Sequence, residues 1–270
     1  MIVDLTQHLN KDVQYGNSDF PISLKPIFYE DGWLCMVPVE NKFAVVREDN
    51  GLALSVVSNR YTLVEHKSIL QTIQSAIETL DLGEVPRGIF VDRGGARMRA
   101  LFKFPNLSKF VSKAFLNDSN DELCPCIKIQ NTYDGTSRVS IHIGAFRFVC
   151  TNLAVGGGGC FAGGFMAIHQ GTIPVETAGK QLESYLTGFD KIVEKYREWK
   201  DRITDADEIR YTISAVAVSH RKAIMSLVKP FPTVYGAYNV ATDYATHKTR
   251  TANTAFEMLA QINAGFQNRF

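Results

Sequence analysis

The sequence predicts an α+β fold: an antiparallel sheet with a helix after its first strands and a helical C-terminal third packed on one face of the sheet. Short apolar runs separated by turn residues fill the first half of the 270-residue chain. Apolar residues at helical spacing dominate the last third. Strands that come first, with helices afterwards, are typical of the α+β class.

The first strands form a meander. Apolar runs between residues 26 and 61 are separated by Asp31-Gly32 and Asp49-Asn50-Gly51, which favour hairpin turns. From Val64 to Leu80 the apolar residues recur at helical spacing, so an amphipathic helix is expected there. Further strands are expected at residues 89–91, 97–104, 126–130 and 138–150.

Helices follow the glycine-rich segment from Gly156 to Gly164. Apolar residues from Leu182 to Trp199 lie on one stripe of a long helix. A second helix is expected from about Ala206 to Val228, and a third from about Tyr244 to Phe266. The predicted division is into residues 1–155, mainly sheet with one helix, and residues 156–270, a glycine-rich hinge and the C-terminal helices of the same domain.

Composition points to a cytoplasmic protein. The first 20 residues are polar and mixed in charge, unlike a signal peptide. No stretch reaches the roughly 18 to 20 apolar residues that a membrane helix needs, so no membrane contact is expected. The five cysteines are scattered and odd in number, which favours reduced thiols over a disulfide framework.

Charge changes sign along the chain. Residues 1–86 contain 6 Lys or Arg against 12 Asp or Glu, a net charge of −6. Residues 87–147 contain 10 against 5, a net charge of +5, and the remainder has a net charge of +2. The basic part therefore coincides with the middle strands.

The middle strands predict a surface for a polyanion. Because strand side chains alternate between faces, Arg97, Arg99 and Lys103 share the face opposite the apolar residues. Two residues along a strand span about 6.6 to 7 Å, close to the phosphate repeat of an extended single strand. Outward carboxylates are expected to be missing here, although simple solvation of an open sheet face is the alternative. The expected phosphate contacts are Arg97, Arg99, Lys103, Lys128, Arg138 and Arg147, and the expected stacking residues are Tyr133 and Phe146.

No motif predicts catalysis, a metal or a cofactor. The glycine-rich segment lacks the Lys-Ser/Thr end of a phosphate-binding loop. Cys124-Pro125-Cys126 is one residue shorter than C-x-x-C, and the six histidines are dispersed. Asp134 stands in an Asp-Gly turn without partner carboxylates, which disfavours a metal-dependent nuclease. We therefore expect a protein without enzymatic activity.

Five short blocks stand in order from about Gly51 to the C-terminus: Ser58–Tyr61, Arg93–Arg97, Asn131–Thr136, Arg147–Asn152 and Tyr235–His247. This series resembles the phage/plasmid-like family known as domain of unknown function 932, which would place a phage-encoded product in the cytoplasm of the host cell. The family pattern has Ser-His where this sequence has Thr132-Tyr133, so a role for that histidine does not carry over. The resemblance implies a mobile-element gene, a setting shared with recombination and anti-restriction functions. The layout is also similar to phage single-strand annealing proteins.

Two functions are expected from these observations. The first is a non-enzymatic DNA-binding protein that holds single strands, in preference to duplexes, during annealing in recombination. The apolar stripes of three helices exceed what one sheet face can bury, which favours a homo-oligomer. The second is an anti-restriction protein whose acidic N-terminal third blocks a host nuclease by protein contact. A host recombination or defence protein is thus a further expected partner.

Overall fold

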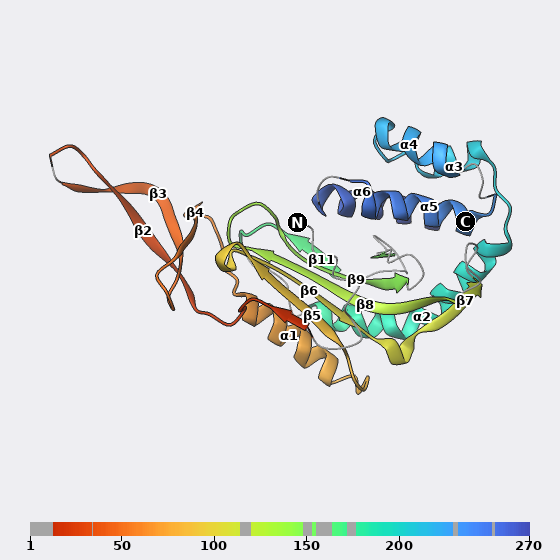
Figure 1. The fold of residues 1–270 in the computed structure, drawn as a ribbon, viewed down its shortest axis with the longest axis horizontal. Helices are drawn as coiled ribbons and strands as arrows, with labels where there is room; N and C mark the ends of the chain where they lie inside the picture. The colour runs from red at the N-terminus through yellow and green to blue at the C-terminus, as the bar shows by residue number, and fades with distance from the viewer. Residues whose placement is uncertain are drawn as a thin grey trace. The chain divides into compact units, whose positions relative to one another are not determined.

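The computed structural model describes residues 13–33, 35–113, 120–147, 153–154, 164–171, 177–228, 232–249 and 252–270 (Figure 1). It confirms the α+β class, with antiparallel sheets and a helical C-terminal third. Two compact units make up the chain. Unit 1 contains residues 1–102, 127–141 and 164–180, and unit 2 contains residues 103–126, 142–163 and 181–270.

The main sheet has eight strands, of which six follow one another side by side. β1 pairs with β5 in parallel, whereas β5–β6, β7–β8 and β9–β10 are antiparallel pairs. β7 (Lys109–Lys113) pairs with β8, and β11 (Gly164–Ala167) pairs with β9. The six strands in spatial order are β1 (Val13–Tyr15), β5 (Arg87–Asp92), β6 (Arg97–Lys103), β8 (Asn120–Thr132), β9 (Val139–Arg147) and β10 (Leu153–Ala154).

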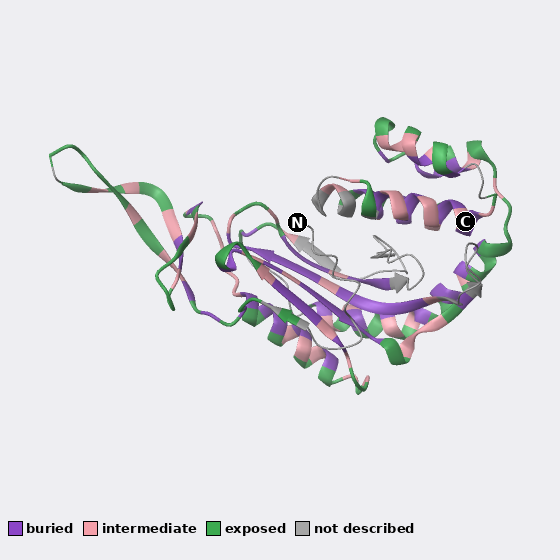
Figure 2. Cartoon of the chain, in the orientation of Figure 1, coloured by how far each residue is buried: buried purple, intermediate pink, exposed green. Residues whose placement is uncertain are grey.

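In unit 1, helix α1 (His66–Glu78) covers one face of β5 and β6, as Figure 1 shows. Its apolar stripe is buried, and Figure 2 shows the same for most of the strand residues beneath it. Arg87 of β5 donates to Gln74 Oε1 of α1 at 2.7 Å. Because Arg87 pairs with Phe102 in register, the face of β6 that carries Phe102 is the face beneath α1.

A second sheet in unit 1 is the predicted meander: β2 (Ile22–Glu30), β3 (Met36–Arg47) and β4 (Ala53–Ser58). Near the main sheet, Ile22, Val45 and Val57 of this second sheet share one core with Phe20, which precedes β2, and Tyr133, which follows β8. The far part of the β2–β3 hairpin, residues 26–41, projects from this core and is mostly exposed (Figures 1 and 2). We call residues 26–41 the arm.

Unit 2 holds most of the helical third. An aromatic core joins three of its helices: Trp199 lies 5.4 Å from Tyr238 and 5.9 Å from Phe266, measured between ring centroids. The Tyr238 hydroxyl donates to Asn263 Oδ1 at 2.5 Å. The helices are α2 (Thr177–Asp201), α3 (Ala206–Thr212), α4 (Val218–Val228), α5 (Val234–His247) and α6 (Ala252–Arg269).

Two of the predicted helices differ from the structure. The helix expected from Ala206 to Val228 is interrupted at residues 213–217 and forms α3 and α4. The helix expected from Tyr244 to Phe266 is wrong, because α5 ends at His247 and α6 begins at Ala252. Thr233 starts α5 by accepting a hydrogen bond from the Gly236 N–H, an N-cap that the prediction missed.

The apolar stripe of α2 lies inside the protein. Its residues Leu182, Tyr185, Phe189, Ile192, Val193, Tyr196 and Trp199 are each at most 5% exposed. This stripe therefore gives no support to self-association, which stays a prediction. The glycine-rich segment expected to act as a hinge falls, apart from Gly164, outside the described residues.

Candidate functional site

Three of the six cations predicted to bind phosphate lie on one face of the main sheet in unit 1. Arg97 and Arg99 alternate with Met98 and Phe102, so they occupy the face of β6 that points away from α1. In β8, Asn131 lies on the face towards α1, where it contacts His66, and alternation places Lys128 on the opposite face. Arg138 is exposed directly before β9. We call Arg97, Arg99 and Lys128, together with the exposed Arg138 that precedes β9, the cationic face.

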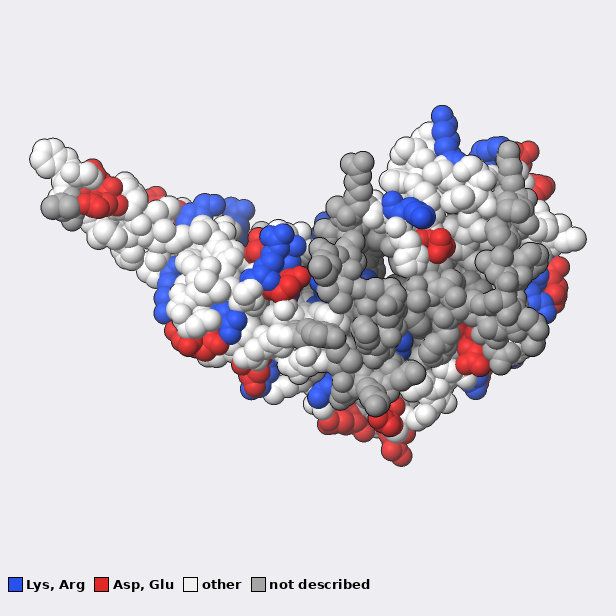
Figure 3. All heavy atoms as spheres, in the orientation of Figure 1, with Lys and Arg blue, Asp and Glu red and all other residues white. Residues whose placement is uncertain are grey.

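The cation-bearing segments 97–104, 127–130 and 138–143 contain no carboxylate of their own, but carboxylates from neighbouring parts of the sheet accompany the cations. Arg97 Nε lies 2.6 Å from Asp134 Oδ2, and Arg99 Nη2 lies 3.2 Å from Asp92 Oδ2. Burial alone would raise the pKa of Asp134, but hydrogen bonds from Thr136 and Arg97 outweigh it and hold the pKa below its ordinary value. In Figure 3, basic and acidic side chains are accordingly interspersed.

Lys103 does not belong to the cationic face. It is 4% exposed, because β6 is covered on both faces from Ala100 onwards. Burial lowers the pKa of its ammonium group, while the nearby thiols of Cys124 and Cys126 oppose that shift. Neither thiol is in a disulfide, and both are buried within β8. The predicted phosphate contact at Lys103 is therefore wrong.

Tyr133 is also unavailable to bases. It is 1% exposed and stacks on His66 with 4.1 Å between ring centroids. Its hydroxyl oxygen accepts the backbone N–H of His66 at 2.7 Å. Tyr133 follows the last residue of β8, and continued alternation would place its side chain on the same face as Ile127 and Ile129. Strand alternation therefore predicts that Tyr133 lies in the core. The side chains of Phe146 and Arg147, the last two predicted contacts, lie outside the described residues.

Three of the sequence blocks meet in unit 1 at a buried polar cluster. His66 Nε2 lies 3.0 Å from the Gly95 carbonyl oxygen of the second block. Asn131, which opens the third block, donates from Nδ2 to His66 Nδ1 and to the Val64 carbonyl, both at 2.9 Å. Tyr61 of the first block donates to the Thr132 carbonyl at 2.9 Å. The blocks are thus held together by side-chain to backbone hydrogen bonds.

These contacts fix the protonation of His66. Nε2 faces a carbonyl and carries the proton, and Nδ1 accepts from an amide. Burial is the main cause that lowers the pKa of His66 to about 4, so the ring is neutral at pH 7. Since both ring nitrogens are engaged, His66 has no nitrogen available for proton transfer to a substrate. We conclude that the cluster shapes the fold.

A second histidine completes the cluster. His169 stacks on Tyr61 with 4.6 Å between ring centroids, and its Nδ1 lies 3.1 Å from the Thr62 carbonyl oxygen. The Thr62 N–H donates to the His169 carbonyl at 2.8 Å. Within the described part of the chain, His169 Nε2 and Asn131 Oδ1 are buried and have no hydrogen-bond partner. Both are acceptors, because Nδ1 of His169 carries the proton that the Thr62 carbonyl accepts.

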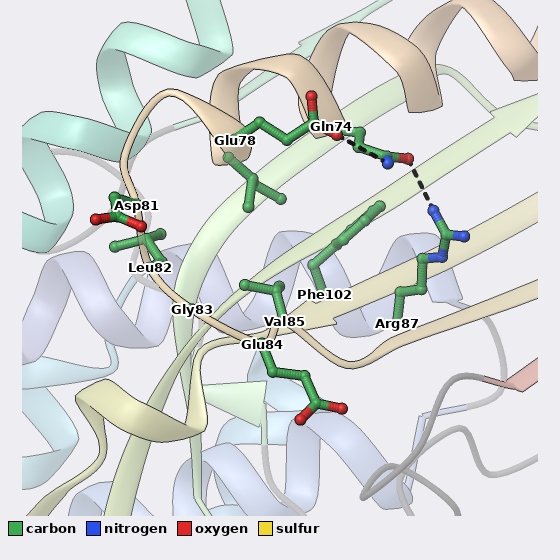
Figure 4. A pocket seen from close by; sticks show the side chains of 10 residues that line it. Gln74, Glu78, Asp81, Leu82, Gly83, Glu84, Val85, Arg87 and Phe102 are labelled. Carbon is green, nitrogen blue, oxygen red and sulfur yellow. Dashed lines mark hydrogen bonds between the residues drawn. The ribbon is translucent and has the colours of Figure 1, made fainter.

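A pocket of about 410 Å³ lies at the end of α1, between the helix and β5–β6 (Figure 4). Ile77, Val85 and Phe102 supply apolar walls, while Glu78, Asp81 and Glu84 place carboxylates at the rim. Gln74 bridges the two charge types, since it accepts from Arg87 and donates to Glu78 Oε1 at 3.1 Å. This composition disfavours a phosphate, so the pocket is not part of the cationic face.

Among the residues that the structure describes, no group of three or more His, Cys, Asp or Glu side chains is arranged to hold a metal ion. Within the same residues, no helix is both long and apolar enough to cross a membrane.

Comparison with known families identifies the class of protein. The family described as a domain of unknown function (DUF932) matches residues 53–266. The chain therefore belongs to this family. The match begins at Ala53, the first residue of β4, so the arm precedes it. Nothing among curated proteins or solved structures matches the chain.

Proposed function

We propose that the chain binds nucleic acid, single strands in preference to duplexes, through the cationic face of unit 1. The observation that carries this proposal is the placement of Arg97, Arg99 and Lys128 on the sheet face away from α1. The register of β5 and β6 places the two arginines there, and alternation with Asn131 in β8 places Lys128 there. A sheet face with cations at strand spacing can follow the backbone of an extended single strand. Binding and annealing need no catalytic group, so no enzymatic step is proposed.

Because carboxylates already pair with two of these arginines, a phosphate of the nucleic acid must replace a carboxylate when it binds. Asp92 is 48% exposed at its side chain and holds Arg99, whose side chain is 25% exposed. A surface ion pair of this kind contributes at most about 1 kcal/mol, so a phosphate can replace the carboxylate. Four cations that each neutralise one phosphate give a slope of log affinity against log salt of about −3, at about −0.7 per contact for single strands.

The test compares this ion pair with a matched pair in unit 2. Arg99→Ala with Arg138→Ala removes two of the four contacts, and we expect weaker binding of a labelled 30-nucleotide single strand and a salt slope reduced by about half. Asp92→Asn leaves Arg99 without its carboxylate and should strengthen binding. Fluorescence anisotropy at several salt concentrations measures both effects.

The control uses the exposed pair of Arg210 and Asp207 in α3. Arg210→Ala with Lys200→Ala removes the same charge, and Asp207→Asn matches Asp92→Asn, so neither should change affinity by more than about twofold. Equal losses in site and control variants would show a nonspecific charge effect. No binding by the unaltered protein at low salt would refute the proposal.

A second candidate is an anti-restriction protein that blocks a host nuclease by protein contact. It is favoured by the exposed arm and by the net charge of −6 over residues 1–86. Nuclease inhibition without binding of single strands would support this candidate over the first.

A further inference from the structure

The arm exposes large apolar side chains that the protein itself does not cover. The exposed fraction is 47% for Phe28, 53% for Tyr29, 86% for Trp33 and 65% for Met36. An isolated two-stranded ribbon is marginally stable in water, and clustered apolar exposure marks an interaction surface. The arm therefore has the composition of a docking element.

The tip of the arm is ordered by its own hydrogen bonds. Asp31 Oδ1 accepts from the backbone N–H of Trp33 at 2.9 Å and of Cys35 at 3.3 Å, and the Asp31 N–H donates to the Cys35 carbonyl at 3.2 Å. These bonds hold Trp33 at the end of the ribbon before any partner arrives. Such preorganisation lowers the entropic cost of binding, and tryptophan is a common anchor in interfaces.

Charge decides the kind of partner. Residues 26–41 contain Glu30, Asp31 and Glu40, all exposed, and no Lys or Arg. The part of the arm visible in Figure 3 shows acidic side chains in this stretch. Phosphates of nucleic acids or anionic lipids would be repelled, whereas a basic protein surface would be attracted.

The arm binds through side chains rather than by adding a strand. Pro26 and Pro38 interrupt the hydrogen-bonding edges of β2 and β3, which discourages pairing with another strand. In register, Phe28 pairs with Pro38 and Glu30 with Met36, so these residues share one face. Two arms packed on each other through this face would bring their glutamates together, which disfavours arm-to-arm contact.

The cationic face of the same chain has an excess of positive charge, since its four cations are accompanied by two carboxylates, Asp92 and Asp134. We propose that the arm docks on the cationic face of a second copy, so that two copies exchange arms reciprocally. A twofold axis then makes two identical contacts, each with Glu30 and Glu40 near Arg99 and Arg138. This inference goes beyond nucleic-acid binding, and its test contains no nucleic acid, so either proposal can fail without the other.

The experiment follows mass by sedimentation velocity and light scattering between about 1 and 200 μM protein. The unaltered protein should form a dimer that weakens with salt. Trp33→Ala should raise the dissociation constant of the dimer by at least tenfold. It should not unfold the protein, because Trp33 is 86% exposed. Glu30→Arg with Glu40→Arg should give monomers, as should Arg99→Glu with Arg138→Glu.

Charge exchange makes the test specific. Mixing the Glu30→Arg, Glu40→Arg protein with the Arg99→Glu, Arg138→Glu protein restores opposite signs at both contacts and should give a heterodimer. Glu194→Arg with Glu198→Arg, an equal charge change on exposed positions of α2, should leave the dimer intact. A monomer at every concentration, or a dimer that survives the arm variants, would overturn the proposal. So would monomers whose Trp33 fluorescence shifts on neutral phosphatidylcholine vesicles, which would assign the arm to a membrane surface.

Discussion

His66 should make unit 1 sensitive to acid. Burial lowers its pKa to about 4 in the folded protein, against about 6.5 for an unperturbed histidine. Between these two pKa values His66 is protonated in the unfolded chain but remains neutral in the folded chain. The contribution of His66 to the free energy of unfolding is therefore fully present above pH 6.5 and is lost as the pH falls towards 4. The loss from this group is about 2 kcal/mol at pH 5 and approaches about 3 kcal/mol below pH 4.

The assay compares the unaltered protein with His66→Gln, which cannot titrate. At pH 7 the variant should be less stable, since the contacts of His66 with Gly95 and Asn131 are disturbed. At pH 5 that difference should shrink by about 2 kcal/mol, measured by urea unfolding and by hydrogen exchange of the α1 amides. At pH 8, where His66 is neutral in the folded and the unfolded chain alike, the difference should equal that at pH 7. A difference independent of pH would refute the assignment of a neutral, buried His66.

Two further predictions concern unit 2. Gly265→Ala would place a Cβ 2.0 Å from the Thr212 carbonyl oxygen, so the free energy of unfolding, measured with urea, should fall by about 3 kcal/mol or more. In the control Gly188→Ala in α2, the new Cβ meets nothing within 4 Å, and the free energy of unfolding should rise by about 1 kcal/mol. Equal effects of the two substitutions would contradict the packing of α6 on α3. Lys103→Met should leave the free energy of unfolding unchanged or raise it by about 1 kcal/mol, and it should leave nucleic-acid affinity unchanged, because Lys103 is buried. If fluorescence anisotropy showed a loss of affinity equal to that of the Arg99 variant, Lys103 would belong to the cationic face.

The sequence predicted elements whose signals are local. The meander turns, the helix after the first strands and the long helix ending near Trp199 all follow from turn residues and apolar spacing. The break at residues 213–217 was missed because apolar residues such as Ile213 and Val216, which are buried, continue the pattern through it. Tertiary packing therefore decides whether such a pattern is one helix or two.

The candidate site was predicted only in part, for a different physical reason. Alternation correctly separates Arg97 and Arg99 from Met98, but it assigns only a face and not its exposure. Lys103 shares their parity and is buried because other parts of the protein cover that end of β6. The partner carboxylates were missed because Asp92 ends the neighbouring strand and Asp134 follows β8, positions that approach the arginines only in the folded sheet.

The two proposals become linked if both hold, because Arg99 and Arg138 serve each of them. An arm and a single strand cannot occupy the same cations, so nucleic acid must favour separation of the dimer. By reciprocity, the factor by which a single strand weakens arm docking equals the factor by which docking weakens strand binding. The acidic arm would then set the concentration of nucleic acid at which a single strand displaces the arm from the cationic face. The opposite charges of the N-terminal and middle segments, net −6 and +5, would thus act on the same equilibrium.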